Sequence, residues 1–103
     1  MKNILLVCTA GMSTSLLVTK MNTAAVRLEV DAKINAVSEA DLKNHIDGVD
    51  VILLGPQVKF LLGKIRDQAK STGAKVEVIN SVDYGTMNGE KVLKYALDLI
   101  NNK

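Results

Sequence analysis

Residues 3–17 read NILLVCTAGMSTSLL and pass from an apolar run, through a polar loop with a glycine, to apolar residues again. The short continuous run at 3–8 is typical of a strand buried on both faces of a sheet. From Ser15 the apolar spacing lengthens, and one face of a helix would carry Leu16, Leu17, Met21, Ala24 and Leu28. The stretch therefore predicts a strand, a tight loop and a helix in succession.

The same alternation between short apolar runs and helical spacing continues to the end of the chain. The later elements expected are strands at 29–37, 50–54 and 75–80, helices at 38–46, 58–70 and 90–101, and a loop at 81–89. This order predicts an α/β protein: a parallel sheet with helices on both faces, in three layers. Because the most hydrophobic strands should be central, we expect a Rossmann-like strand order of 2-1-3-4, similar to the low-molecular-weight phosphatase topology.

This strand order predicts where a ligand would bind. In such sheets, ligands bind at the carboxyl ends of the strands, beside the point where the chain reverses its direction of winding. Here that point lies between the first and third strands. Three loops should meet there, at Cys8–Thr14, Gly55–Gln57 and Ser81–Gly85.

The composition indicates a globular protein and argues against several other classes. The chain has 103 residues, 48% of them hydrophobic and 23% charged, as expected for one globular domain. A net charge of +2 and an aromatic content of 3% argue against a nucleic-acid partner. The apolar run from Ile4 to Val7 is too short for a secretory signal, and no stretch is long enough to span a bilayer.

The single cysteine cannot form an internal disulfide, which favours a reducing compartment and a cytoplasmic location. The chain also has only one histidine, so no cluster of metal ligands is expected, and no cofactor. We expect His45 to be a solvated side chain on a polar helix, remote from the cysteine loop and without an acid–base role.

The loop after Cys8 has the chemistry of an anion site. Its backbone N–H groups, with those of the first helical turn, can form a cradle for an anion, and Gly11 gives the turn conformational freedom. Ser13, Thr14 and Ser15 can cap the helix and donate hydrogen bonds. A thiol that faces the positive end of a helix is favoured as the thiolate. The loop therefore predicts a nucleophile beside a phosphate site.

A second interpretation of Cys8 is purely structural, because a free cysteine is often a small buried hydrophobe. The spacing alone leaves these two interpretations equally open. A redox role is weaker than either, since there is no second cysteine to resolve a disulfide.

A comparison with cysteine phosphatases indicates which reaction the Cys8 loop could support. Their loop has a cysteine, five residues, then an arginine and a serine or threonine; here Thr14 occupies the arginine position and Ser15 follows. The arginine would clamp the phosphoryl oxygens in the transition state. No Asp-Pro pair supplies a general acid, since Pro56 is the only proline. A cysteinyl phosphate in such a loop would form and then resist water, as suits a carrier.

Three stretches carry a resemblance to a known family. CTAGMSTSLLV (8–18), VILLGPQ (51–57) and KVEVINSVDYG (75–85) resemble the enzyme IIB components of the bacterial sugar phosphotransferase system, lactose/cellobiose (chitobiose) family. The likeness extends over essentially the whole chain and implies a single IIB domain at 1–103. Asn80 departs from the aspartate expected before the last loop.

The resemblance implies a phosphocarrier, a phosphotransferase component that takes phosphate from a phosphohistidine of the IIA protein. Cys8 would hold the phosphate and give it to a sugar on the IIC membrane permease, a β-linked disaccharide such as cellobiose, chitobiose or lactose. The permease would bind the sugar and hold this cytoplasmic chain near the inner face of the membrane. We expect a monomer, because the sequence shows no obvious exposed apolar stripe. The implied phosphate-binding residues are Thr9, Ala10, Gly11, Met12, Ser13, Thr14 and Ser15.

Partner contacts are expected from the loops nearest to Cys8, at Met12, Pro56, Gln57 and Tyr84. Flexible methionine suits a surface that must meet different partners. Two alternatives stay open: a cysteine-dependent phosphatase or arsenate reductase, and a non-catalytic regulator that binds an anion at the same loop.

Overall fold

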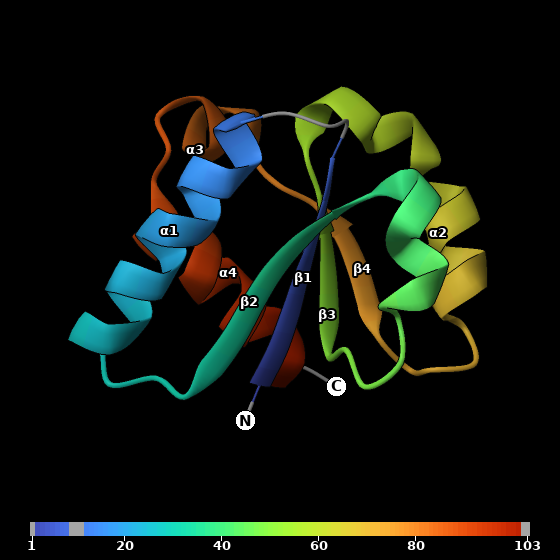
Figure 1. The fold of residues 1–103 in the computed structure, drawn as a ribbon, viewed down its shortest axis with the longest axis horizontal. Coiled ribbons are helices and arrows are strands. Elements are labelled where there is room, and N and C mark those ends of the chain that lie inside the picture. The colour runs from blue at the N-terminus through green and yellow to red at the C-terminus, as the bar shows by residue number, and fades with distance from the viewer. Residues whose placement is uncertain (1, 9–11, 102–103) are drawn as a thin grey trace.

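A computed structural model describes residues 2–8 and 12–101 of the chain, with side chains at 2–8 and 14–101. Its sheet consists of the strands β1 (Lys2–Cys8), β2 (Ala32–Ser38), β3 (Val51–Leu54) and β4 (Lys75–Val78). All the pairings are parallel, and the order is β2-β1-β3-β4 (Figure 1). The predicted strand order is therefore confirmed.

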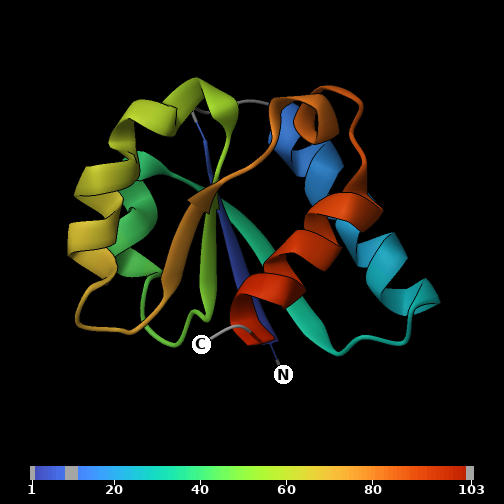
Figure 2. The ribbon, with the colours of Figure 1, turned by 180° about the vertical axis from the view of Figure 1, so that it is seen from behind.

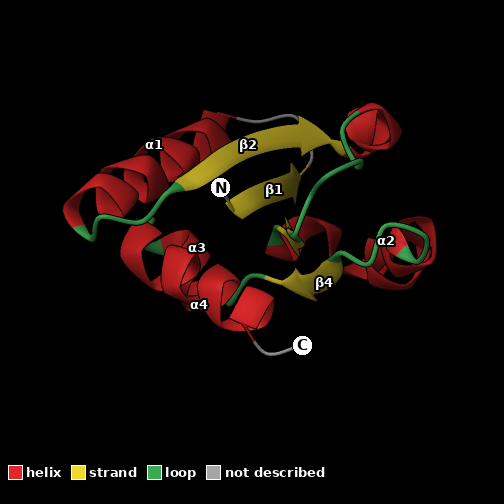
Figure 3. Cartoon of the chain, turned by 90° about the horizontal axis from the view of Figure 1, so that it is seen from below, coloured by secondary structure: helices red, strands yellow, loops and turns green. Residues whose placement is uncertain are grey.

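Helices cover both faces of this sheet. The helical elements are α1 (Met12–Arg27), α2 (Leu62–Ala69), α3 (Ser81–Gly85) and α4 (Gly89–Asn101), with the 3-10 turns η1 (Glu39–Asn44) and η2 (Pro56–Leu61). α1, α3 and α4 lie on one side of the sheet and α2 on the other (Figures 2 and 3). The predicted three-layer α/β architecture is confirmed.

Alternating side chains of the central strands separate two hydrophobic clusters. Ile4 and Leu6 of β1 face α1 and α4, and Leu5 and Val7 face η1, η2 and α2. All four residues of β3 are buried as well, so the two middle strands are covered on both faces. Each fully buried aliphatic side chain contributes about 1.5–3 kcal/mol of transfer free energy, which places these continuous apolar runs at the centre.

Strand β2 is at the edge of the sheet, as its alternating sequence predicted. Ile34 is buried, whereas its neighbours Lys33 and Asn35 are exposed. The strand begins at Ala32 rather than at residue 29, because the chain first turns through Glu29, whose φ is 57°.

Two predicted helices differ from the structure. The apolar spacing predicted one helix over residues 58–70. The structure instead divides this segment into η2 and α2, and Val58 has a non-helical φ of −117° and ψ of 23°. The predicted short helix at 38–46 is the 3-10 turn η1. Against the prediction, Leu16 of α1 is 50% exposed and Leu28, which follows the end of α1, is 39% exposed. The buried face of α1 instead carries Leu17, Met21, Ala24 and Ala25.

The prediction of a loop over residues 81–89 is wrong in its first half. Helix α3 begins there because Asn80 Oδ1 accepts hydrogen bonds from the N–H groups of Val82 (2.8 Å) and Asp83 (3.3 Å). This is the N-cap arrangement that satisfies the free amides at the start of a helix. The asparagine that departs from the expected aspartate thus performs the same capping role.

Glycine allows an unusually close contact between α1 and α4. A Cβ atom on Gly89 would lie 2.5 Å from the carbonyl carbon of Lys20 and 2.7 Å from the nitrogen of Met21. The first turn of α4 therefore packs directly against the α1 backbone. None of the helices in the described parts of the chain is long and apolar enough to cross a membrane.

Candidate functional site

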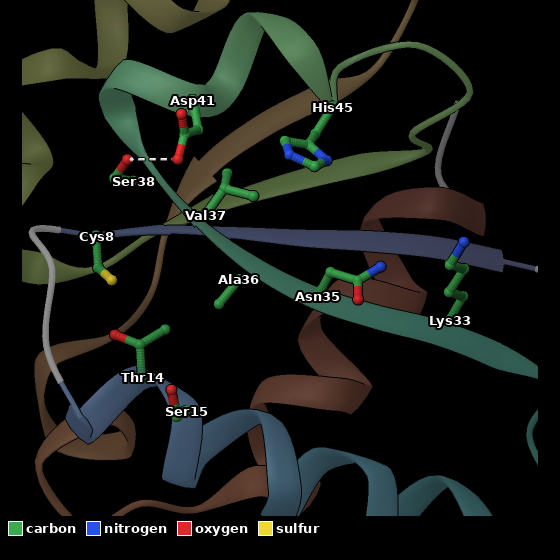
Figure 4. A pocket seen from close by; sticks show the side chains of 10 residues that line it. All are labelled: Cys8, Thr14, Ser15, Lys33, Asn35, Ala36, Val37, Ser38, Asp41 and His45. Carbon is green, nitrogen blue, oxygen red and sulfur yellow. Dashed lines mark hydrogen bonds between the residues drawn. The ribbon is translucent and has the colours of Figure 1, made fainter.

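Cys8 is the last residue of the central strand β1, at the carboxyl edge of the sheet where α1, α3 and η2 also begin (Figure 1). Only 6% of Cys8 is exposed, yet it lines a hollow of about 660 Å³. In Figure 4 the Cys8 sulfur and the side chains of Thr14 and Ser15 point into this same space. The hollow therefore brings together the end of β1 and the first turn of α1, as predicted.

Neighbouring backbone packs closely against the cysteine. The Gly55 N–H donates a hydrogen bond to the Val7 carbonyl at 2.9 Å, which extends the β1–β3 pairing to the edge. A Cβ atom on Gly55 would lie 3.6 Å from Cys8 Cβ and 3.7 Å from Tyr84 Cε2. Gly55 thus lies between Cys8 and the Tyr84 ring, and an added Cβ there would contact both.

Thr14 is a polar residue that is buried in the described part of the chain, with only 3% of it exposed. Its Oγ1 atom forms a buried hydrogen bond with the Tyr84 hydroxyl at 3.1 Å. Tyr84 itself is 8% exposed and belongs to α3. This bond joins the first turn of α1 to α3 beside the cysteine.

The N-terminus of helix α1 favours an anion in the hollow, whereas the Asp41 carboxylate opposes one. The sixteen-residue helix α1 starts at this edge with no acidic side chain in its first turn. The aligned peptide dipoles of a helix place partial positive charge at its N-terminus. Asp41 also lines the hollow, and it accepts a hydrogen bond from the Ser38 hydroxyl at 3.4 Å.

The far side of the hollow comes from β2 and η1, which sequence reasoning did not connect with the cysteine. The lining residues there are Lys33, Asn35, Ala36, Val37, Ser38, Asp41 and His45. The expectation that His45 is remote from the site is wrong, because it lines the opposite end of the same hollow, beyond Val37 (Figure 4). The parallel pairing of Cys8 with Ser38 in the sheet register explains this proximity.

The other predicted site residues divide into two groups. Thr9, Ala10 and Gly11 lie outside the described residues, as do the side chains of Met12 and Ser13, whose backbone begins α1. Pro56 and Gln57 begin η2 next to Gly55; Gln57 is exposed and Pro56 partly so.

Metal ligands do not gather at the hollow. Across residues 2–8 and 14–101, no three His, Cys, Asp or Glu side chains come together in a group that could hold a metal ion.

Comparisons with known proteins agree with this geometry. The sequence profile described as "PTS system, Lactose/Cellobiose specific IIB subunit" matches residues 3–95. The chain is 48% identical to a galactose-specific EIIB component of Lactococcus lactis subsp. cremoris, over 97% of each chain. It is 42% identical to an oligo-beta-mannoside-specific EIIB component of Bacillus subtilis, over 100% of each.

Solved structures give the same result. A cellobiose-specific IIB component from Borrelia burgdorferi has a TM-score of 0.81 at 47% identity, covering 99% of this chain and 94% of the other. The lactose-specific IIB domain from Streptococcus pneumoniae has a TM-score of 0.85 at 20% identity, with 94% and 95% covered, and shows the shared fold. The chain therefore belongs to the lactose/cellobiose-specific IIB family of the sugar phosphotransferase system (PTS).

Proposed function

We propose that Cys8 carries a phosphoryl group from a phosphohistidine of a IIA protein to a sugar held by a IIC permease. One observation carries this proposal above the others. Cys8 ends a central strand and opens into a hollow that it shares with Thr14 and Ser15, at the start of the sixteen-residue helix α1. A thiol there is next to amides and hydroxyls that can hold phosphoryl oxygens.

The proposed reaction has two in-line steps. In the first, the Cys8 thiolate attacks phosphorus; an S–P bond forms, and the P–N bond breaks with its electron pair left on the histidine nitrogen. The imidazole leaves neutral because its other nitrogen carries a proton. In the second, a sugar hydroxyl oxygen attacks phosphorus, the S–P bond breaks, and the thiolate is regenerated. The hydroxyl proton passes to a base on the permease.

The composition of the site supports a carrier over a hydrolase. The sequence has two arginines, and neither lines the hollow. Arg27 pairs with Glu90, and Arg66 pairs with Glu77 at 3.1 Å. A phosphatase would need an arginine where Thr14 lies to stabilise the charge of a hydrolytic transition state. Phosphocysteine would therefore persist until an acceptor reaches it.

Exposed apolar side chains around the site support docking of protein partners. Leu16, Phe60 and Val82 are 50%, 77% and 67% exposed. They belong to α1, η2 and α3, the elements that begin at the carboxyl edge of the sheet (Figure 1). Single exposed apolar residues are common, but three on the elements that begin at the edge carrying Cys8 suit transient contacts with IIA and IIC. The proposed contacts at Met12, Pro56 and Gln57 belong to the same edge. Tyr84 is only 8% exposed, so we do not propose its expected contact with a partner.

We propose a β-linked disaccharide such as cellobiose, chitobiose or lactose as the sugar. Relatives named for cellobiose and for galactose are each 48% identical to this chain. This equality supports sugar selection by the permease rather than by the carrier. We further propose that residues 1–103 act as one IIB domain, monomeric and without a cofactor, in the cytoplasm beside IIC.

The test is transfer from a phosphorylated IIA protein of the lactose/cellobiose type. We expect the intact mass of the chain to rise by one phosphoryl group, and Cys8→Ser to remain at its original mass. Equal labelling of Cys8→Ser would overturn the assignment. Sustained hydrolysis of an aryl phosphate, lost in Cys8→Ala, would instead support the phosphatase. Binding of inorganic phosphate without any covalent adduct would support an anion-binding regulator.

A further inference from the structure

The Thr14–Tyr84 hydrogen bond places two buried hydroxyls beside the candidate site. Burial of two hydroxyls is favourable only where they satisfy one another, and here they do so at 3.1 Å. No buried side-chain nitrogen or oxygen in the described part of the chain lacks a partner. Thr14 occupies the position that holds the arginine in the phosphatase loop, and it lines the same hollow as Cys8.

Tyr84 is held firmly enough to orient another group. Its N–H donates to the Asn80 carbonyl at 2.9 Å, within the turn that Asn80 caps. Its ring packs beside Gly55, with Cε2 3.7 Å from the position that a Cβ would occupy there. The backbone of Tyr84 is therefore held within α3, and its ring lies beside Gly55, which follows β3.

The chemistry of the two hydroxyls assigns a direction to the bond. Each hydroxyl has one hydrogen to donate and lone pairs that accept. The distance fits either direction, but a phenol is more acidic than an aliphatic hydroxyl, which favours Tyr84 as the donor and Thr14 Oγ1 as the acceptor. Among the described residues, the Thr14 hydroxyl has no other hydrogen-bond partner, so its hydrogen can meet an acceptor in the hollow that Thr14 lines together with Cys8 (Figure 4).

We propose that Tyr84 is a positioning residue that directs the Thr14 hydroxyl hydrogen toward a phosphoryl oxygen on Cys8. This inference rests on the proposed carrier function. Thr14 touches the phosphoryl group, and Tyr84 acts through Thr14. A neutral hydroxyl orients the group without the positive charge of an arginine, and so without favouring attack by water.

The test is a double-mutant cycle with the variants Tyr84→Phe, Thr14→Val and the two combined. Loss of a donor to a developing charge slows a reaction by about a hundredfold, so Thr14→Val should slow transfer from IIA by about that factor. Tyr84→Phe keeps the ring and should slow transfer about tenfold, through lost orientation. The double variant should match Thr14→Val within about twofold, because Tyr84 has no route of its own.

Controls separate positioning from stability. Tyr95→Phe removes the other tyrosine hydroxyl, on α4 and outside the hollow, and should leave transfer unchanged. Thr14→Ser retains the hydroxyl and should regain most of the rate lost in Thr14→Val. Urea unfolding of each variant gives the fraction folded, so that rates refer to folded protein. If the two single effects multiply in the double variant, the positioning role is wrong, although labelling of Cys8 would stand.

A second readout does not depend on the IIA partner. Inorganic phosphate should protect Cys8 from iodoacetamide, and both single variants should need more phosphate for half protection. The double variant should need no more than Thr14→Val. If wild-type protein takes no phosphate from IIA, the carrier function fails, and this readout still decides whether Tyr84 acts through Thr14. Unchanged protection in Tyr84→Phe would overturn the positioning role.

Discussion

Helix α1 meets the rest of the molecule in two different ways along its length. At Lys20 and Met21 its backbone is pressed against Gly89 of α4, with no room for a single Cβ atom. At Thr14 it instead faces a polar hollow, where a hydroxyl pair replaces close apolar packing. The comparison indicates that close packing in the middle of α1 holds the helix on the sheet. Its first turn can therefore carry polar groups that line the hollow.

We expect the largest effect from a substitution that disrupts the close contact between α1 and α4. Gly89→Ala should destabilise the fold by about 3 kcal/mol, near the upper end for an overpacked site, because the clashing atoms are backbone and cannot rotate away. Urea unfolding measures this loss. Transfer per folded molecule should stay close to wild type.

Gly63 on α2 offers the matched control. An added Cβ there meets nothing within 4 Å, so Gly63→Ala should stabilise the protein by about 0.5–1 kcal/mol. If the two alanine substitutions changed stability by the same amount, the close α1–α4 contact would not matter.

The next largest effect distinguishes an exposed apolar residue at the edge that carries Cys8 from one at the far end of α1. Phe60 is exposed at the edge that carries Cys8, whereas Val26 is 80% exposed in the last turn of α1. Phe60→Ala should weaken the apparent affinity for phosphorylated IIA by about tenfold, as for a central aromatic contact. Val26→Ala should change neither affinity nor rate. Steady-state kinetics at varied IIA concentration provide the measurement, and equal effects of the two substitutions would contradict docking at this edge.

The smallest effect distinguishes the two tyrosines. Burial raises the pKa of Tyr95 above its ordinary value of 10.0, the Glu77 carboxylate raises it further, and the Arg66 guanidinium opposes both. In Tyr84→Phe, Tyr95 is the only tyrosine, so its ultraviolet titration should have a midpoint above 10.0. Glu77→Gln should lower that midpoint; no change would exclude the carboxylate as a cause.

The sign of this shift also predicts a pH dependence. Because the folded state favours the neutral phenol, the contribution of Tyr95 to stability is fully present below its unfolded-state pKa of about 10. The contribution is lost as the pH rises through the higher folded-state pKa of Tyr95.

Alternation of apolar runs was enough to predict the sheet, because continuous runs at 3–8 and 50–54 require burial on both faces. It was also enough to place Cys8 at the carboxyl edge. It could not predict α3, whose start depends on one capping side chain, Asn80, rather than on apolar spacing. Nor could it divide 58–70 into η2 and α2, because the change of φ at Val58 leaves the apolar spacing intact.

Only one wall of the hollow could be predicted from the sequence. The loop from Cys8 and the hydroxyl of Thr14 follow from local sequence, since they are neighbours along the chain. The opposite wall follows from the register that pairs Cys8 with Ser38, thirty positions away, and this brings His45 to the same hollow. Which segments face one another across the edge of a sheet is a property of tertiary packing, which local patterns do not contain.

The most direct test of the central claim is phosphorus NMR of the protein after transfer from phosphorylated IIA. We predict a single resonance in the range of S-linked phosphate, absent from Cys8→Ala prepared in the same way. A resonance from phosphate bound to nitrogen or oxygen, retained in Cys8→Ala, would contradict the assignment of Cys8 as the phosphoryl carrier.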